Sequence, residues 1–354
     1  MKKPYSIKEF DPITAEEQEL FKLFELLDVT FREMEKDDPL PTNEFRLKNF
    51  RHKEPTFDDF WWLVWEDNKV RGFCILTIRN QSNVSYEENK HVAYVQIRIQ
   101  KDHRRNGLGL KLVKKVIQKS KEIGVIAALQ NTTAYESGYA FSEKLNGILA
   151  MESTTNRCRF ANIDWNLMEE WKKQGQVRSK KDERSLKWFE KCPEDIIEEF
   201  CNVYTETMNQ QPLGEIETRA IITPESRRIT EQEFAKLGYI WHSVITREKN
   251  GAISGITDMT YIPDRPYRIE QELTGVKNEY RGKGLGKWLK SEMLHFIHKK
   301  YPNAKYISTG NADSNAAMLS INTRMGFKPH QQRKTYKFNL IEIEKRIAEI
   351  ESKN

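Results

Sequence analysis

The chain has 354 residues, of which 38% are hydrophobic and 31% charged, and its formal net charge is +6. This is a polar but globular composition, long enough for two domains, and it excludes a disordered or low-complexity chain. No apolar stretch approaches the roughly 18 residues of a membrane-spanning helix. The mild positive charge suits an anionic ligand and does not by itself indicate nucleic acid.

The first half is expected to contain a hairpin, a strand, a helix and a further strand–helix pair. A hairpin is predicted where two apolar runs flank a polar turn, and helices where apolar residues recur at helical spacing. The expected elements are strands 61–65 and 70–76, a strand 91–99, a helix following residue 109, a strand 125–129 and a helix through Phe141 and Leu145.

The second half repeats this order. Gly326 is expected to end the penultimate helix, and the last helix is expected to be exposed. The expected elements are strands 241–246 and 252–257, a strand 267–276, a helix following residue 286, a strand 306–308, a helix from about 314 to 324 and a helix 340–350.

The motif R-x-x-G-x-G occurs once in each half, at 104–109 and at 281–286. The two copies are 177 residues apart, half of the 354-residue chain, which indicates a tandem duplication. Residues 172–184 are polar and charged and include the basic run 178–181, which is typical of a linker. The predicted division is therefore an N-terminal domain 1–172, a linker 173–184 and a C-terminal domain 185–354.

The four cysteines are scattered, and none forms a C-x-x-C pair. Scattered reduced thiols, with no apolar signal region at the N-terminus, predict a cytoplasmic protein without a membrane partner. His295 and His298 are spaced as on one helix face, but no third ligand stands near them in the sequence. No metal site is predicted.

A glycine-rich turn between a strand and a helix lets backbone amides and the helix N-terminus meet an anion, and phosphate or pyrophosphate is the natural guest. The spacing of Gly282, Gly284 and Gly286 disfavours the dinucleotide motif G-x-G-x-x-G. A Walker A loop is also disfavoured, because Lys287 is followed by Trp288.

The combination of a strand ending at Val276, the 281–286 motif and a helix resembles the acetyl-CoA-binding motif of the GNAT acetyltransferase superfamily. The second half adds the segment 311–318 and then Gly326-Phe327, which is similar to a later helix of that superfamily. The first half has a degenerate version of this later helix at 141–147. The whole chain looks like the tandem arrangement of mycothiol-synthase-like proteins.

The resemblance implies an α/β (α+β) fold of two tandem acyl-CoA N-acyltransferase domains, each a mixed, mostly antiparallel sheet flanked by helices. It implies acetyl-CoA (coenzyme A) as the cofactor, with a splayed strand admitting the pantetheine arm. The cofactor-binding residues it implies are Thr274, Val276, Arg281, Gly282, Lys283, Gly284, Leu285, Gly286, Lys287, Asn311 and Asn315, with Ile99, Arg104, Arg105, Asn106, Gly107, Leu108 and Gly109 in the first half.

Superfamily members often place a catalytic Glu on the strand before the motif, so Glu272 and Glu270 are the candidate bases. Strand alternation puts both on one face with Thr274 and Val276, provided no bulge intervenes. Many relatives carry a Tyr acid where this chain has Asn322. The first half has Val95, Ile97 and Ile99 at the positions matched to Glu272, Thr274 and Val276, so it is expected to be degenerate.

The leading function is therefore an acetyl-CoA-dependent N-acetyltransferase with its chemistry in the C-terminal domain. Its acceptor is expected to be a primary amine of a small molecule or peptide. Glu206, Glu215 and Glu217 are candidates for recognising a cationic amine, or else are surface acids. The alternative is a CoA-binding sensor or scaffold without turnover. A nucleic-acid partner ranks last, and a monomer or homodimer is expected.

Overall fold

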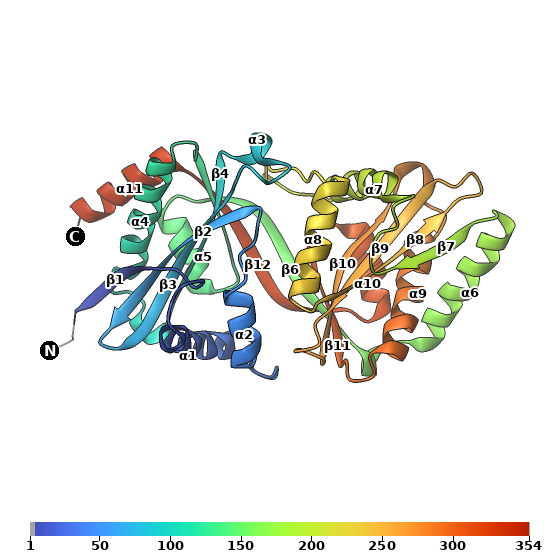
Figure 1. The fold of residues 1–354 in the computed structure, drawn as a ribbon, viewed down its shortest axis with the longest axis horizontal. Helices are drawn as coiled ribbons and strands as arrows, with labels where there is room; N and C mark the ends of the chain where they lie inside the picture. The colour runs from blue at the N-terminus through green and yellow to red at the C-terminus, as the bar shows by residue number, and fades with distance from the viewer. Residues whose placement is uncertain (1–3, 354) are drawn as a thin grey trace. The chain divides into compact units, whose positions relative to one another are not determined.

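The computed structural model describes residues 4–353, and contacts divide them into two compact units (Figure 1). The N-terminal unit combines the residues up to 151 with those from 334 onward, and the C-terminal unit consists of residues 152–333. Each unit contains a sheet with helices on both faces.

In the N-terminal unit the strand order is β1-β2-β3-β4-β5-β12. All the neighbouring pairs are antiparallel except β4 and β5, which are parallel. The elements are β1 (Tyr5–Phe10), α1 (Glu17–Met34), α2 (Asn43–Phe50), β2 (Phe57–Glu66), β3 (Lys69–Arg79), α3 (Tyr86–Asn89), β4 (Val92–Ile99), α4 (Leu108–Ile123), β5 (Ala128–Thr133), α5 (Glu136–Lys144), β12 (Lys328–Asn339) and α11 (Leu340–Ser352).

In the C-terminal unit the order is β6-β11-β10-β9-β8-β7, with β10 and β11 parallel. The elements are β6 (Ile148–Arg159), α6 (Trp165–Lys181), β7 (Ser185–Phe189), α7 (Ile197–Asn209), α8 (Pro224–Lys236), β8 (Ile240–Arg247), β9 (Ile253–Tyr261), β10 (Arg268–Val276), α9 (Leu285–Lys300), β11 (Tyr306–Ala312) and α10 (Ala316–Met325). Single 3₁₀ turns at Lys101–His103 and Asn278–Tyr280 precede α4 and α9.

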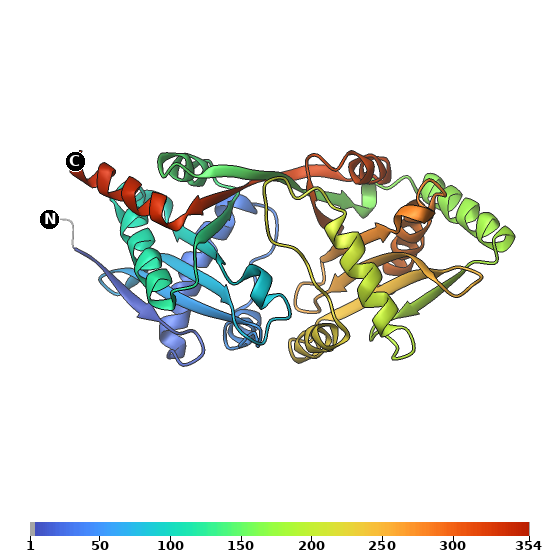
Figure 2. The same cartoon turned by 90° about the horizontal axis from the view of Figure 1, so that it is seen from above.

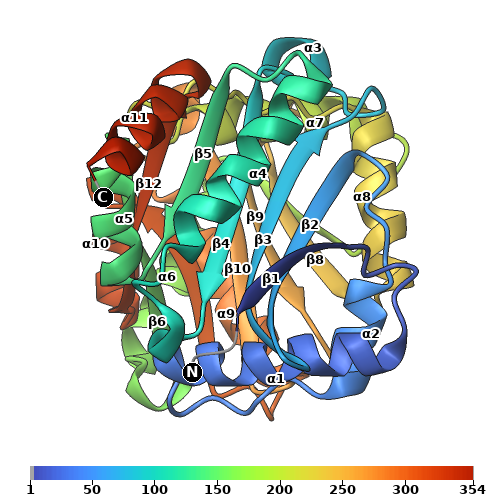
Figure 3. The ribbon, with the colours of Figure 1, turned by 90° about the vertical axis from the view of Figure 1, so that its left-hand side faces the viewer.

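Each sheet has a hydrophobic core on each of its two faces. In the N-terminal unit, buried side chains of α4 and α11 share one core with the sheet, and the two helices lie side by side (Figure 3). Helix α1 packs on the opposite face through Leu23 and Leu26. In the C-terminal unit, α6 and α9 cover one face and α7 covers the other. The hairpins, central strands and glycine-turn helices expected in each half are all present.

The two halves of the sequence exchange their last strand and helix. Residues 153–159 of β6 pair with β11, and α6 packs on α9 in the C-terminal unit. Residues 334–339 of β12 pair with β5, and α11 follows directly, as the red segment of Figure 2 shows. The units therefore differ from the predicted division at 172 and 185.

The stretch predicted as a linker lies mostly in helix α6, so that expectation is corrected. Its buried residues Met168, Trp171, Gly175 and Ser179 recur at helical spacing among many exposed polar residues. A Cβ on Gly175 would stand 2.1 Å from Cγ of Trp288, so the glycine allows α6 to approach α9 closely. The polar composition reflects an exposed outer face and not a flexible chain.

Helix α11 is also less exposed than expected, because Leu340, Ile343, Ile347 and Ile350 are buried in the N-terminal unit. His298 lies against the rings of Phe160 and Trp165. Among residues 4–353 there is no group of three or more His, Cys, Asp or Glu side chains placed to hold a metal ion. Within the same residues no helix is long and apolar enough to cross a membrane.

Candidate functional site

The two glycine turns have the same backbone geometry. Gly284 and Gly107 have φ angles of 80° and 75°, in the left-handed region that favours glycine. Two residues earlier in each turn, Gly282 has φ 77° and Arg105 has φ 64°. Within residues 4–353 the amides of these four residues donate to no other group, and each turn opens directly into a helix. Both turns are therefore built to receive an anion.

The arginine that opens each motif is held inside its own unit. Arg281 Nε donates to the carbonyl oxygen of Val276 at 3.2 Å, and its Nη2 contacts Gln210 at the end of α7. Arg104 Nε donates to the carbonyl oxygen of Ile99 at 2.9 Å, and its Nη2 pairs with Glu33 of α1 at 2.6 Å. Arg281 therefore connects the end of β10 to the end of α7, and Arg104 connects the end of β4 to α1. These contacts position the two turns.

The strand before each turn separates from its parallel neighbour, as the resemblance implied. Strand β10 pairs with β11 only over Arg268–Glu270, and the hydroxyl of Thr309 then donates to the Gln271 carbonyl at 3.1 Å. Strand β4 pairs with β5 only over Val92–Tyr94, and the Asn131 amide then donates to the Val95 carbonyl at 2.7 Å. The gap between the strands follows in both units.

The Val276 amide faces this gap. The Lys277 amide donates to the Ser254 carbonyl on β9, and antiparallel bonding alternates along a strand. The neighbouring Val276 N–H therefore points away from β9, toward the side where β11 has separated. This leaves a backbone donor at the end of β10, beside the glycine turn.

A bulge interrupts β10, so the predicted alternation is wrong beyond it. Gln271 lies opposite Met259 and Thr274 lies opposite Thr257, which leaves one extra residue on β10. Strand β4 pairs with β3 without a break from Tyr94 to Ile99. Glu272 and Leu273 therefore stand where β4 has only Gln96, and Val95 corresponds to Gln271 rather than to Glu272.

The bulge sends the candidate residues to different faces of the sheet. The Thr274 hydroxyl bonds that of Thr257 at 2.7 Å, and Val276 lies beside Gly286 on the α9 side. Gly275, between them, lies against Thr207 of α7. Glu270 lies before the bulge and Glu272 within it, and both have the opposite orientation to Thr274, on the side of α7 and α8.

The two candidate glutamates differ in charge environment. Glu270 pairs with Arg268. Glu272 is exposed to solvent yet crowded by protein atoms. This desolvation, with the charges of Glu270 and Asp258, raises its pKa to about 7, and the nearby Thr260 hydroxyl opposes the shift. A carboxylate with such a pKa can accept a proton near neutral pH.

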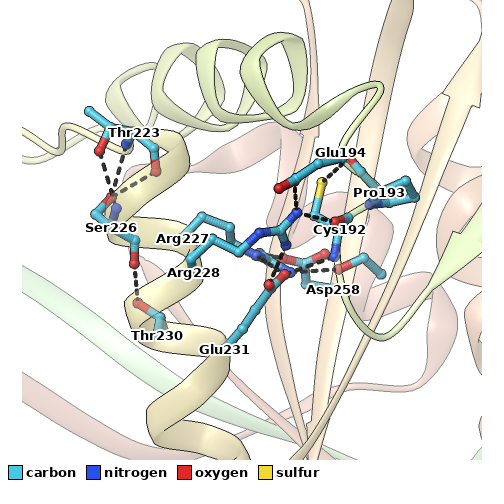
Figure 4. Close-up of polar contacts among 11 residues, drawn as sticks. Cys192, Pro193, Glu194, Thr223, Ser226, Arg227, Arg228, Thr230, Glu231 and Asp258 are labelled. Carbon is cyan, nitrogen blue, oxygen red and sulfur yellow. Dashed lines mark hydrogen bonds and ion pairs between the residues drawn. The ribbon is translucent and has the colours of Figure 1, made fainter.

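Behind Glu272 lies a buried polar network that the sequence pattern did not reveal (Figure 4). Arg227 of α8 is 2% exposed, and its Nε donates to Glu231 at 2.9 Å. Its Nη1 lies 4.0 Å from Asp258 Oδ2, and its guanidinium stands 3.5 Å from the ring centre of Trp241. Burial raises the pKa of Asp258, and Arg227 opposes this shift. The only sequence signal was one Asp within the buried strand 253–261.

The N-terminal unit has no such network at the matching positions. In β8 and β9, Ser243 lies opposite Asp258, whereas the corresponding pair in β2 and β3 is Trp61 opposite Ile75. Trp61 and Ile75 pack with the apolar core beneath α1. The buried polar network therefore distinguishes the C-terminal unit from the N-terminal unit.

The candidate asparagines are engaged within the fold. Asn315 caps α10 by accepting from the Met318 amide at 3.3 Å. Asn322, 2% exposed, donates through Nδ2 to Asn311 Oδ1 at 2.8 Å. Asn322 thus orients Asn311 at the end of β11, and at this position it supplies no phenolic acid.

A cavity of about 470 Å³ lies in the N-terminal unit, over the gap between β4 and β5. It is lined by the predicted residues Ile99, Arg104, Arg105, Gly107, Leu108 and Gly109. Of the described residues that line it, none is Asp or Glu. The cavity and the candidate base Glu272 therefore belong to different units.

Comparison with known proteins points to one superfamily. Residues 20–146 match the sequence model of the acetyltransferase (GNAT) family. The chain matches a tandem GNAT protein from the clavulanic acid biosynthesis pathway, with a TM-score of 0.72 and 17% identity over 95% of this chain and 99% of that one. A GCN5-related N-acetyltransferase from Sphaerobacter thermophilus matches with a TM-score of 0.67 and 13% identity over 96% and 97%. A search of curated proteins gave no match.

A third similar structure is a glucosamine N-acetyltransferase region in a fungal multi-domain GH3 β-N-acetylglucosaminidase. Its TM-score is 0.65 at 13% identity, over 95% of this chain and 38% of that one. The fold likeness spans both units, while the family match lies within the N-terminal one. The predicted fold class is confirmed: residues 20–146 match the GNAT acetyltransferase family, and the chain as a whole has the fold of tandem GNAT proteins.

Proposed function

We propose that the protein is an acetyl-CoA-dependent N-acetyltransferase whose chemistry takes place in the C-terminal unit. The acceptor is a primary amine of a small molecule or peptide. The bulge in β10, which presents Glu272 with a pKa near 7 beside the strand gap, is the observation that carries the proposal. We also propose that the protein is cytoplasmic and is a monomer or a homodimer.

The residues fit acetyl-CoA because the turn amides of Gly282–Gly284 are unengaged within the described chain and β10 does not pair with β11 beyond Glu270. Acetyl-CoA supplies the activated acetyl group. The turn and the first turn of α9 would hold its pyrophosphate. The Val276 N–H would donate to the acetyl carbonyl oxygen as negative charge develops there. Thr274 would contact the arm from the α9 side.

Glu272 would take the proton from the attacking amine. An alkyl ammonium has a pKa of about 10, so the amine must lose a proton to become a nucleophile. The raised pKa of Glu272 matches a base that works near neutrality. Glu270, paired with Arg268, would act on Glu272 through its charge rather than as the base itself. The leaving thiolate needs no dedicated acid, because a thiol pKa is only about 8.5.

The test is thiol release from acetyl-CoA with a panel of primary amines, for wild type, Glu272→Gln and the exposed control Glu198→Gln. We expect Glu272→Gln to lower kcat by roughly 100-fold or more, since a general base contributes about 10²–10⁴-fold. The calorimetric Kd for acetyl-CoA should stay within about twofold of wild type. The wild-type rate should rise with pH through about 7, and the variant should lack that limb. Equal loss of rate in both variants would remove Glu272 as the base.

The alternative, CoA binding without turnover, is favoured by one observation. The described cavity lies in the unit whose lining contains no carboxylate. Binding of acetyl-CoA with no thiol release across the amine panel would support this alternative. Loss of that binding in Gly107→Glu but not in Gly284→Glu would place it in the N-terminal unit.

A further inference from the structure

Gln271 lies where β10 changes its pairing with both of its neighbours. It is the last residue before the bulge, opposite Met259 of β9. It also directly follows Glu270, the last residue of β10 that pairs with β11. Gln271 is 8% exposed and has no part in the proposed transfer reaction. A buried amide in such a place must find hydrogen-bond partners within the fold.

The side-chain amide of Gln271 is held by β9. Its Nε2 donates to the Thr257 hydroxyl at 3.1 Å and to the backbone carbonyl oxygen of Asp258. In the described pairing, Asp258 lies between the residues opposite Gln271 and Thr274 and has no partner residue on β10. The Gln271 amide therefore supplies donors to β9 where the bulge interrupts the ladder.

The same contacts reach across the bulge. The Thr257 hydroxyl also bonds that of Thr274 at 2.7 Å, on the other side of the bulge. The backbone carbonyl oxygen of Gln271 accepts from the Thr309 hydroxyl of β11 at 3.1 Å. Thr257 is 0% exposed. Gln271, Thr257 and Thr274 thus form a polar bridge that holds both ends of the bulge, and Glu272 lies between those ends.

The N-terminal unit provides a comparison within the same chain. Its strand β4 pairs with β3 without a break, and apolar residues occupy all three positions of the polar bridge. The residues that correspond to Gln271, Thr274 and Thr257 are Val95, Ile97 and Cys74. All three pack in or against the core beneath α4. The bridge and the bulge occur together in one unit and are both absent from the described part of the other, which indicates that the bridge maintains the bulge.

We propose that Gln271 is a positioning residue for Glu272: its side-chain amide holds the bulge of β10 and so keeps the Glu272 carboxylate in place for the acceptor amine. The inference rests on the proposed function, in which Glu272 is the base. Gln271 acts through the backbone and not on the reacting atoms. A base displaced by about 1 Å can cost roughly 100-fold in rate, so a small movement of the bulge is enough.

The first test removes the amide and keeps the bulk of the side chain. Gln271→Met lacks the Nε2 donor, and we expect its kcat to be at least about tenfold lower. The calorimetric Kd for acetyl-CoA should stay within about threefold, because the 281–286 turn is not part of the bulge. The matched control is Gln174→Met, whose amide bonds Glu170 on the exposed face of α6. Equal losses in both variants, or a Kd that weakens as much as kcat falls, would overturn the inference.

A double-mutant cycle distinguishes positioning from general damage. If Gln271 acts through Glu272, Gln271→Met should lower kcat by less than about twofold in a protein that already carries Glu272→Gln. Independent losses that multiply in the double variant would mean that Gln271 acts on something other than the base. That result would contradict the proposal.

Thr257 supplies a second pair of variants should Gln271→Met fail to fold. Thr257→Val keeps the shape of the side chain and loses the hydroxyl, whereas Thr257→Ser keeps the hydroxyl. The Val variant should have a kcat at least about fivefold below that of the Ser variant, and it enters the same cycle with Glu272→Gln. Equal kcat in the two variants would refute the polar bridge.

Amide exchange tests the bridge without acetyl transfer. The variant that folds, Gln271→Met or Thr257→Val, should exchange the amides of residues 272–275 about tenfold faster or more, with those of α9 unchanged. Unchanged exchange at 272–275 would overturn the inference whatever the kinetics. Full activity of Glu272→Gln would remove both the proposed base and this role. A large loss in Glu272→Gln, with neither kcat nor exchange altered by Gln271→Met, would remove this inference alone.

Discussion

The carboxyl of Glu272 links catalysis to stability. Its folded-state pKa of about 7 lies above the ordinary value of 4.5, so between these values the folded state binds more protons than the unfolded state. Stability contributed by this group is therefore present below pH 4.5 and lost as the pH rises through 7. We predict that Glu272→Gln has a higher Tm than wild type at pH 8 and an equal Tm at pH 4. Thermal unfolding across this range measures it, and a Tm difference independent of pH would contradict it.

The buried Arg227 has the opposite role, since its charge compensates two buried acids. Arg227→Met would leave the buried Asp258 without its cation and Glu231 with Arg228 alone. Breaking a buried ion pair from one side costs about 3–5 kcal/mol. The control Arg247→Met removes a partly exposed pair with Glu199 and should cost about 1 kcal/mol or less. Urea unfolding of both variants measures the loss in free energy of unfolding. Equal losses would show that the buried network contributes no more to stability than the partly exposed pair.

Helix α6 adds a cation to the glycine turn of the C-terminal unit. Arg178 Nη1 donates to the Lys283 carbonyl at 3.2 Å, next to Gly284. The close packing of Gly175 on Trp288 fixes this end of the helix against α9. The turn of the N-terminal unit has no comparable neighbour, since a Cβ at Gly107 would meet no described atom within 4 Å.

We therefore predict that Arg178→Ala weakens acetyl-CoA binding by about fivefold, the effect of roughly 1 kcal/mol from one solvated charge at close range. The KM should rise and kcat should stay constant, because Arg178 contacts the glycine turn, at Lys283, and not the candidate base. Raising the salt concentration should shrink the difference. The control is Lys173→Ala, on the same helix and 70% exposed. A fall in kcat, or an equal effect of Lys173→Ala, would refute this role.

Local patterns predicted the elements, and non-local contacts decided the rest. Gly284 and Gly326 were predictable because a left-handed turn residue leaves a signal in the sequence itself. The bulge at Glu272 was not, since it depends on how β10 pairs with β9. Asp258 was overlooked because its partner Arg227 is 31 residues away in the sequence and on another element. Helix α6 was mistaken for a linker because its partner α9 lies in the other half of the sequence.

At the scale of the whole molecule, the exchange of terminal segments makes neither half of the sequence a complete folding unit. The N-terminal unit takes part of β12 and all of α11 from the end of the chain. Six apolar side chains of this segment are buried in its core: Tyr336, Phe338, Leu340, Ile343, Ile347 and Ile350. Each contributes about 1.5–3 kcal/mol when fully buried, so together they match the total stability of a typical domain, about 5–15 kcal/mol.

This comparison predicts how fragments behave. Residues 1–172 alone should not unfold cooperatively, because the core beneath α4 loses the buried side chains of β12 and α11, and β5 loses its partner strand. Residues 1–151 joined to 334–354 through a short Gly-Ser linker should unfold cooperatively, although this chain contains no more residues of the protein than the first. The measurement is urea unfolding followed by both tryptophan fluorescence and circular dichroism. Coincident sharp transitions in the 1–172 fragment would mean that the duplicated halves, and not the exchanged units, are the domains of this protein.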